Sequence, residues 1–134
     1  MLKFALAHHP GLRHSFVYSN KTWDDVIFRD ELGRLAAAHP DRLRLLHTLT
    51  REEDPGRFGP GVRKGRVDQA LLREAIPSPD ACAVYVCGPG ISKFDLAAAK
   101  AAGTAPAPRF LESALADLTA IGVPDARVRR EFYG

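Results

Sequence analysis

The sequence predicts an α/β domain, a Rossmann-like parallel sheet with helices on both faces. Apolar runs of strand length alternate with amphipathic helical segments, and this alternation is typical of parallel strands joined by helical crossovers. The run over residues 82–87 is almost continuously apolar, as in a strand buried on both faces. The length of 134 residues and the 46% hydrophobic content are those of one soluble domain, which we expect to span residues 1–134.

The spacing of hydrophobic residues along the chain indicates whether each segment is a helix or a strand. In chain order we expect a helix over residues 2–9, a strand over 14–18, a helix from Thr22 to the residue before His39, a strand over 43–50, a helix over 68–76, a strand over 82–87, helices over 92–102 and 110–121, and a strand over 127–133.

Helix-breaking and helix-capping residues support these boundaries. Pro10-Gly11 stops the first helix and His39-Pro40 stops the second. Thr22 is the expected N-cap of the second helix, with Asp25 three residues later. Residues 51–65 hold four glycines and two prolines among charged residues, so we expect a long loop there.

The charge balance argues against a nucleic-acid-binding protein. The chain has 19 basic and 16 acidic residues, and its net charge is +3. It has no basic stripe and no known nucleic-acid-binding module. The longest basic cluster is Arg127, Arg129 and Arg130. This cluster is either a solvated strand end or an attraction site for an acidic electron-transfer partner or an anionic cofactor.

Cysteine and histidine usage predicts no disulfide and no metal site. Cys82 and Cys87 are five residues apart, so on one strand they would point to opposite faces. None of the five histidines stands in a metal-binding pair on a helix. The apolar stretch at the N-terminus is too short for a signal sequence or a membrane span. We therefore expect a cytoplasmic protein in a reducing compartment, with no membrane partner.

The chemistry of such a sheet is expected just beyond the carboxyl ends of its strands. Residues 19–21, 50–52 and 87–90 occupy these positions. Cys87 is either a buried cysteine before an ordinary turn or a thiol at the edge where a flat ligand approaches glycine backbone. Arg51 is either a solvated loop residue or a charge-assisted contact to an anionic group such as a 2′-phosphate.

Four motifs in order resemble the ferredoxin-reductase family of flavoproteins. Val84-Tyr-Val-Cys-Gly-Pro89 is similar to that family's Cys-Gly-Pro motif. The segment from Tyr18 to Leu32 resembles its Tyr-x-Asn-x-Thr and Phe-x-Asp-Glu-Leu stretch. Thr50-Arg51-Glu52 with Gly65-Arg66-Val67 resembles the adenosine-side loop, and Arg130-Glu-Phe-Tyr-Gly134 the closing strand. The match covers nearly the whole chain and implies an NAD(P)-binding domain.

The resemblance implies a nicotinamide pocket at two strand ends. Cys87 would lie near the nicotinamide ring, and Glu131 would approach the junction between nicotinamide and flavin. These two residues are the catalytic candidates. The residues implied to bind the cofactor here are Cys87, Gly88, Pro89, Phe132 and Tyr133. For Glu131 and the two aromatic residues the alternative is a packed terminal strand. Hydride transfer requires positioning more than proton chemistry.

On the adenosine side the resemblance implies roles for Thr50, Arg51 and Arg66. Thr50 and Arg51 would face the ribose that carries the 2′ position, with Arg66 nearby. Plant-type members have a lysine and a tyrosine shortly before the Gly-Arg motif, where this chain has Pro60 and Val62. The cofactor is therefore NADP or NAD, and both remain open.

The family pattern also predicts parts that this sequence does not contain. The domain usually opens with a strand and a pyrophosphate-binding Gly-Gly-x-Gly-x-x-Pro loop, and a flavin-binding barrel precedes it. We therefore expect residues 1–134 to be a partial NAD(P)-binding domain, with FAD held on a missing domain or a partner. The implied partners are a flavin-binding domain or subunit and an electron-transfer protein.

Two further expectations follow from this pattern. The first strand would lie between the strands at residues 14–18 and 82–87, so its absence leaves open edges that can pair with a second copy to give a homo-oligomer. The stretch between Ile91 and Phe110 is longer than usual, resembles a bacterial subset and is a candidate partner contact.

Three functions compete at this point. The first is a dinucleotide-binding domain that feeds a flavin, inactive as an isolated chain. The second is a catalytically inactive binding or scaffold module that keeps the fold. The third is an unrelated doubly wound domain such as a response receiver, but no apolar run here ends in the clustered aspartates that such a domain needs.

Overall fold

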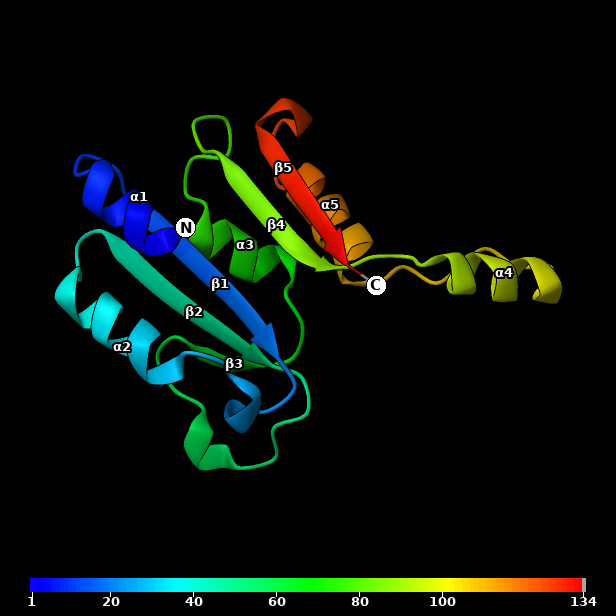
Figure 1. Ribbon diagram of the computed structural model, residues 1–134, viewed down its shortest axis with the longest axis horizontal. Coiled ribbons are helices and arrows are strands. Elements are labelled where there is room, and N and C mark those ends of the chain that lie inside the picture. Colours follow the sequence, from blue (N-terminus) through cyan, green and yellow to red (C-terminus); the bar gives the residue numbers. More distant parts are fainter. Residues whose placement is uncertain (134) are drawn as a thin grey trace. The chain divides into compact units, whose positions relative to one another are not determined.

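The computed structural model describes residues 1–133, which fold into two compact units, Met1–Val67 and the part of the chain from Asp68 on. Each unit contains its own parallel sheet, as Figure 1 shows. The strand order is β1-β2-β3 in the first unit and β4-β5 in the second. The predicted α/β class with parallel pairing is confirmed, and each unit is described separately below.

The first sheet is built from β1 (His14–Asn20), β2 (Leu43–Leu49) and β3 (Val62–Lys64). The β1–β2 pair runs in register from the amino to the carboxyl end of both strands, so the two end together. The short β3 joins at the carboxyl end of β2. Three leucines of β2 are buried, and Leu49 is completely inaccessible to solvent. The core of this unit therefore lies along β2.

Two helices accompany this sheet, α1 (Leu2–His8) and α2 (Arg29–Ala38). Helix α2 packs against β2. Lys3 of α1 forms an ion pair with Glu31 of α2 that links the two helices. At the amino end of the sheet, Arg42 donates hydrogen bonds to the carbonyls of Leu6 and His9 and so secures the end of α1.

The structure corrects two expectations for this unit. The helix expected from Thr22 does not form as one piece. The carboxylate of Asp25 accepts hydrogen bonds from the N–H and the hydroxyl of Thr22, which closes a single turn, η1 (Trp23–Asp25). The backbone at Val26 is extended. Helix α2 begins only after Phe28, whose φ of 58° lies in the left-handed region. Val26 is buried at this break.

The second correction concerns the loop over residues 51–65. It contains a short turn, η2 (Pro55–Arg57), and the strand β3, which was not predicted. A three-residue strand carries too little hydrophobic pattern to be recognised in sequence. Its position depends on Gly61, whose φ is +79° and where an added Cβ would lie 3.1 Å from the Leu45 carbonyl oxygen. A side chain at this position would be strained.

The second unit contains α3 (Gln69–Ala75), β4 (Val84–Pro89), α4 (Lys93–Ala102), α5 (Phe110–Ala120) and β5 (Val128–Tyr133), with a turn, η3 (Asp125–Arg127), before β5. Helix α5 packs on β4, and α3 packs on α5. The side chains buried in this core include Leu71, Leu111 and Leu118. Strand β4 starts after Cys82 and runs on through Gly88-Pro89, where a break was expected.

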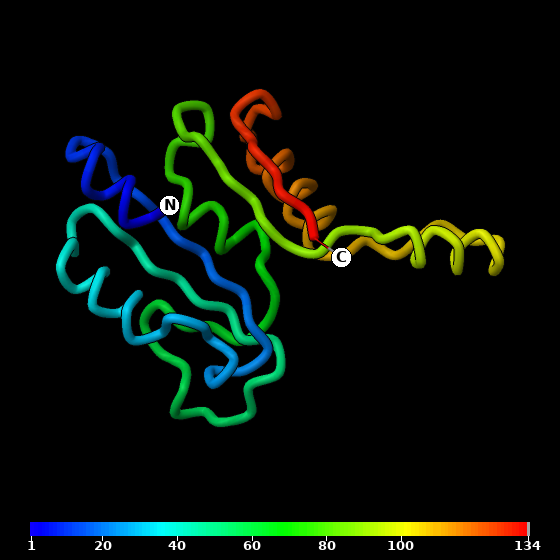
Figure 2. Tube along the Cα trace, viewed as in Figure 1, coloured from blue at the N-terminus to red at the C-terminus, as the bar shows by residue number. Residues whose placement is uncertain are grey.

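Helix α4 and the segment that returns from it form an arm, residues 91–109, which Figure 2 shows running outward from β4 and back to α5. Ser92 and Asp95 form a capping box at the start of the helix, and Gly103 ends it with a left-handed φ of 66°. Phe94 and Leu96 are exposed on this arm. Within residues 1–133 no helix is long and apolar enough to span a membrane.

Candidate functional site

The first group of predicted site residues meets at the carboxyl ends of β1, β2 and β3, here called the β1–β3 edge. The backbone N–H of Thr50 donates to the Asn20 carbonyl at 3.0 Å, and its hydroxyl is 3.3 Å from the same oxygen. The next N–H, of Arg51, donates to the Lys21 carbonyl at 2.8 Å. The segments that follow β1 and β2 therefore stay side by side beyond the sheet.

Arg51 and Arg66 lie at the same edge, as expected. Leu49 and Lys64 are register partners, and each arginine follows one of them by two residues. The Gly65 N–H donates to the Leu49 carbonyl at 3.0 Å, and the φ of +111° at Gly65 turns the chain at this point. Both arginines are exposed. The edge thus presents two cations from adjacent strand ends, an arrangement suited to an anionic ligand.

Glu52 organises this edge in a way that sequence reasoning missed. Its carboxylate accepts hydrogen bonds from the backbone N–H groups of Trp23 at 2.8 Å, Asp54 at 3.0 Å and Glu53 at 3.1 Å. These bonds, that from Trp23 first, lower the pKa of Glu52. The contact between Glu52 and Trp23 spans 29 residues, so no local pattern could have indicated it.

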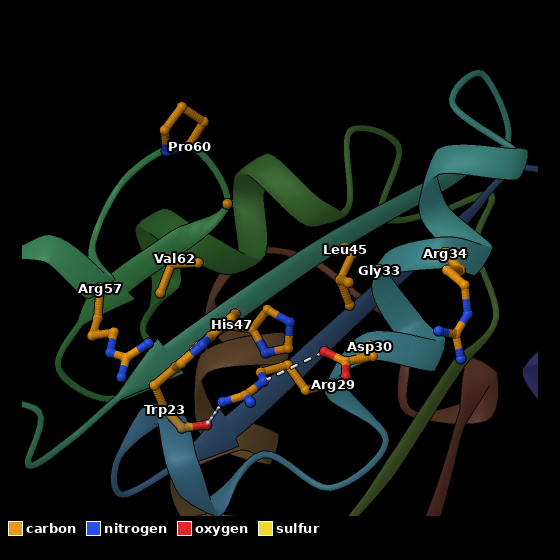
Figure 3. Close-up of a pocket in the computed structure, with 11 residues that line it drawn as sticks. Trp23, Arg29, Asp30, Gly33, Arg34, Leu45, His47, Arg57, Pro60 and Val62 are labelled. Atoms are coloured by element: carbon orange, nitrogen blue, oxygen red, sulfur yellow. Dashed lines mark hydrogen bonds and ion pairs between the residues drawn. The ribbon is translucent and has the colours of Figure 1, made fainter.

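A shallow hollow of about 580 Å³ lies on the first unit between α2, η1 and the β2–β3 pair (Figure 3). Trp23 packs edge-on against His47, with ring centroids 5.2 Å apart. The guanidinium of Arg29 lies 5.5 Å from the centre of the Trp23 ring and donates to the Trp23 carbonyl. The lining residues are Trp23, Arg29, Asp30, Gly33, Arg34, Leu45, His47, Arg57, Pro60, Gly61 and Val62.

Carboxylates offset much of the positive charge in this hollow. Arg29 forms ion pairs with Asp24 and Asp30, and Arg57 pairs with Asp54. His47 is 4% exposed, and burial lowers its pKa, so its ring is neutral near pH 7. Its Nδ1 atom has no hydrogen-bond partner among the described residues. None of the site residues predicted from sequence lines the hollow.

The second group of predicted residues meets at the carboxyl ends of β4 and β5, here called the β4–β5 edge. Cys87 and Glu131 are register partners in this parallel pair, and both are exposed. Side chains at paired positions share one face of a sheet, so the thiol and the carboxylate stand next to each other. Phe132 and Tyr133 pair with Gly88 and Pro89 and are more than half exposed.

Two glycines permit close packing directly behind this edge. A Cβ on Gly88 would lie 2.2 Å from the Phe110 ring, and one on Gly90 would lie 2.9 Å from the Phe132 ring. Glu112, in the first turn of α5, accepts the Ile91 N–H through Oε1 and the Arg109 N–H through Oε2, both at 2.9 Å. Sequence reasoning did not identify Glu112, which is 21 residues from Ile91.

Both predicted groups are therefore assembled, one in each unit. Within residues 1–133 no group of three or more histidine, cysteine, aspartate or glutamate side chains is placed to hold a metal ion. The features at the two edges are an arginine pair in the first unit and an exposed thiol beside a carboxylate in the second.

A family model for the oxidoreductase NAD-binding domain matches residues 1–94, more than half of the chain. This chain belongs to that family. The maize protein "Nitrate reductase [NADH] 1" is 40% identical over 74 residues, which are 54% of this chain and 12% of the maize protein. The human protein "NADH-cytochrome b5 reductase 2" is 32% identical over 78 residues, 58% of this chain and 27% of the human one.

Solved structures agree with this family. The CS-b5R domains of human Ncb5or in the NAD⁺ form superpose with a TM-score of 0.69 at 26% identity, covering 96% of this chain and 31% of that one. The cytochrome P450 reductase GcoB of Amycolatopsis has the same fold, with a TM-score of 0.65 at 21% identity over 98% of this chain and 32% of that one. The chain thus spans about a third or less of the proteins it matches here. The resemblance to the NAD(P)-binding domain of ferredoxin-reductase-like flavoproteins is confirmed.

Proposed function

We propose that this chain binds NADPH or NADH and places the nicotinamide for hydride transfer to a flavin held on another domain or on a partner protein. The observation that carries the proposal is the pairing of exposed Cys87 with Glu131 at the end of a parallel strand pair, in a member of an NAD-binding family. Ligands of open parallel sheets bind beyond such strand ends.

The β1–β3 edge fits the adenosine half of a dinucleotide. Arg51 and Arg66 supply two exposed guanidinium groups, each able to make bidentate bonds to a phosphate or to stack on a flat ring. Thr50 is held by Asn20 at the base of the same edge. We therefore propose that Arg51 binds a 2′-phosphate, which makes NADPH the preferred cofactor.

The β4–β5 edge fits the nicotinamide half. A nicotinamide supplies a hydride at one ring carbon, and a flavin accepts it. Cys87 would contact the ring, Gly88 leaves the neighbouring backbone without a Cβ, and Phe132 and Tyr133 offer exposed flat faces. Glu131 would hydrogen-bond polar groups at the junction. These residues orient the ring and exclude water, which suits a reaction limited by geometry.

The proposal includes partners. The second unit carries three arginines around the start of β5, Arg127, Arg129 and Arg130, which give the surface an excess of positive charge. Such a surface attracts acidic proteins by long-range electrostatics. We propose a flavin-bearing domain or subunit as the direct partner and an acidic electron carrier as the next acceptor.

The test combines binding with chemistry. Calorimetric titration of the chain with NADPH and NADH measures binding, and stopped-flow reduction of flavin in the protein that carries this chain measures hydride transfer. Dinucleotide binding together with flavin reduction supports the proposal. Absence of binding to either dinucleotide, in a chain shown to be folded, contradicts it and favours an inactive scaffold module.

A further inference from the structure

We propose that Glu112 is a positioning residue that holds the backbone on the carboxyl side of Cys87 in the shape needed by the nicotinamide, and that it does so by closing the base of the arm formed by residues 91–109. This inference rests on the proposed function and deepens it. Glu112 is assigned no contact with the cofactor.

The hydrogen bonds of Glu112 define the role. One carboxylate oxygen accepts the N–H of Ile91, where the chain leaves the β4–β5 edge, and the other accepts the N–H of Arg109, where the chain returns to α5. The two ends of the arm are thereby joined through a single side chain. Without the Glu112 side chain, only the arm itself would connect Ile91 to Arg109 and fix the position of the residues that follow Pro89.

The packing around this carboxylate leaves the backbone little room. The Phe110 ring occupies the space that a Cβ on Gly88 would need. On Gly90, a Cβ would meet Phe132 at 2.9 Å, a Glu112 oxygen at 3.1 Å and Leu111 at 3.4 Å. The first turn of α5 is thus pressed against the segment from Gly88 to Ile91. A movement of Glu112 would be transmitted directly to the proposed pocket.

An ion pair between Arg109 and Asp95 stiffens the same base. Arg109 donates through Nε to Asp95 at 3.1 Å, and Asp95 also accepts the N–H and hydroxyl of Ser92. The hydrogen bond from Ile91 is the main cause of the lowered pKa of Glu112, so the carboxylate stays ionised in its clamped state. Because both of its oxygens accept backbone bonds, Glu112 is suited to hold geometry rather than to transfer protons.

The test compares three variants in the full 134-residue chain. Glu112→Ala removes both acceptors, Glu112→Gln keeps one acceptor at nearly the same size, and Asp125→Asn removes an exposed carboxylate elsewhere in the same unit. Each protein is titrated by NMR with nicotinamide mononucleotide and, separately, with 2′,5′-ADP. The exchange rates of the Ile91 and Arg109 amides are measured alongside.

We expect Glu112→Ala to weaken binding of nicotinamide mononucleotide by about five- to tenfold. This is less than the roughly tenfold or more expected for loss of a charge-assisted bond to the ligand itself, because Glu112 acts on the ligand only through the backbone. The affinity of Glu112→Gln for nicotinamide mononucleotide should lie between those of Glu112→Ala and the unmodified chain. The affinity of Asp125→Asn should equal that of the unmodified chain. Affinity for 2′,5′-ADP should stay within about twofold in all variants, because its site is on the first unit. The Ile91 and Arg109 amides should exchange faster in Glu112→Ala.

Three results would overturn the inference. An equal loss of affinity for both ligands in Glu112→Ala would indicate general unfolding. Unchanged affinity for nicotinamide mononucleotide despite faster amide exchange would show that the clamp does not shape the pocket, while leaving the proposed function intact. Failure of the unmodified chain to bind either fragment would defeat the proposed function and this inference together.

Discussion

Cys87 and Glu131 are register partners in the parallel β4–β5 pair, which brings an exposed thiol and an exposed carboxylate to the same face of the second sheet. Both were catalytic candidates on family resemblance, and the pairing places them at the same edge of the sheet. Their catalytic roles stay predictions, and the first experiment addresses them.

Replacing Cys87 with alanine should slow hydride transfer much more than it weakens dinucleotide binding. We expect the thiol to set how the nicotinamide ring approaches the flavin. If the ring is misplaced, the rate of hydride transfer falls by about tenfold for each 1.4 kcal/mol added to the activation barrier. Stopped-flow flavin reduction, measured in a protein that joins this chain to a flavin-bearing domain, and calorimetric titration of the same variant with dinucleotide separate the two effects. Cys82→Ala is the matched control, because Cys82 precedes β4 and its thiol contacts the Pro79 carbonyl. Equal losses in rate and affinity, or no loss in either, would contradict the assignment.

Replacing Arg51 with alanine should weaken NADP binding by roughly tenfold or more and leave NAD binding almost unchanged. A charge-assisted contact contributes about 1.5–3 kcal/mol, which corresponds to at least such a factor. Isothermal titration with both dinucleotides gives the ratio. Arg13→Ala is the control, because Arg13 is an exposed arginine of the same unit just before the amino end of β1. The prediction fails if the unmodified chain already binds NAD as tightly as NADP.

Replacing Gly88 with alanine should destabilise the second unit by roughly 1–3 kcal/mol, the usual cost of overpacking. The new methyl group would start 2.2 Å from the Phe110 ring, so the ring and the first turn of α5 must move. Urea denaturation measures the change. Gly59→Ala should have little effect, because nothing lies within 4 Å of a Cβ there. Adding Phe110→Leu to Gly88→Ala should recover part of the loss, and a Gly88→Ala protein as stable as the unmodified one would rule out this close packing.

The stability of the first unit should fall as the pH drops below about 6.5. Burial lowers the pKa of His47 from its ordinary value of 6.5. Between the lowered pKa and the ordinary one, the unfolded chain binds a proton that the folded chain does not. The stabilisation is therefore complete above the ordinary pKa and is lost as the pH falls through the folded one. Burial also lowers the pKa of His14, which adds to the slope in the same direction.

Urea denaturation at pH 7.5, 6.5 and 5.5, followed in His47→Gln and in the unmodified chain, checks this dependence. The slope attributable to one group cannot exceed about 1.4 kcal/mol per pH unit. The His47→Gln variant should show a shallower slope than the unmodified chain. Identical slopes in the two proteins would contradict a neutral, buried His47.

The chain should associate with itself as its concentration rises. Strand β1 is at an edge of its sheet, and the β4–β5 pair consists of two edge strands. Edge strands offer unpaired backbone groups to another copy. Sedimentation velocity over a range of concentrations measures the association, and enzyme assays on the same samples should show no flavin reduction by the isolated chain. A monomer that stays monodisperse at every concentration, or flavin reduction by the isolated chain, would contradict the prediction.

The sequence by itself determined the class of fold, the order of the longer helices and strands, and the residues at the strand ends. Those properties follow from short-range patterns. The apolar run before Cys87 forms a strand because its side chains need burial on its neighbours, and Thr50 and Arg51 follow β2 because polar residues end an apolar run. The family motifs predicted a role for Cys87 without any structure.

Tertiary structure alone decided the register that pairs Cys87 with Glu131, the placement of β3, and the break at Val26 that delays α2. It also decided the long-range hydrogen bonds by which the carboxylate of Glu52 holds the Trp23 backbone and that of Glu112 joins Ile91 to Arg109. The physical reason is common to all of them. Each depends on groups far apart in the chain, whose contact is favourable only after packing has removed water from between them, and a local pattern does not carry that information.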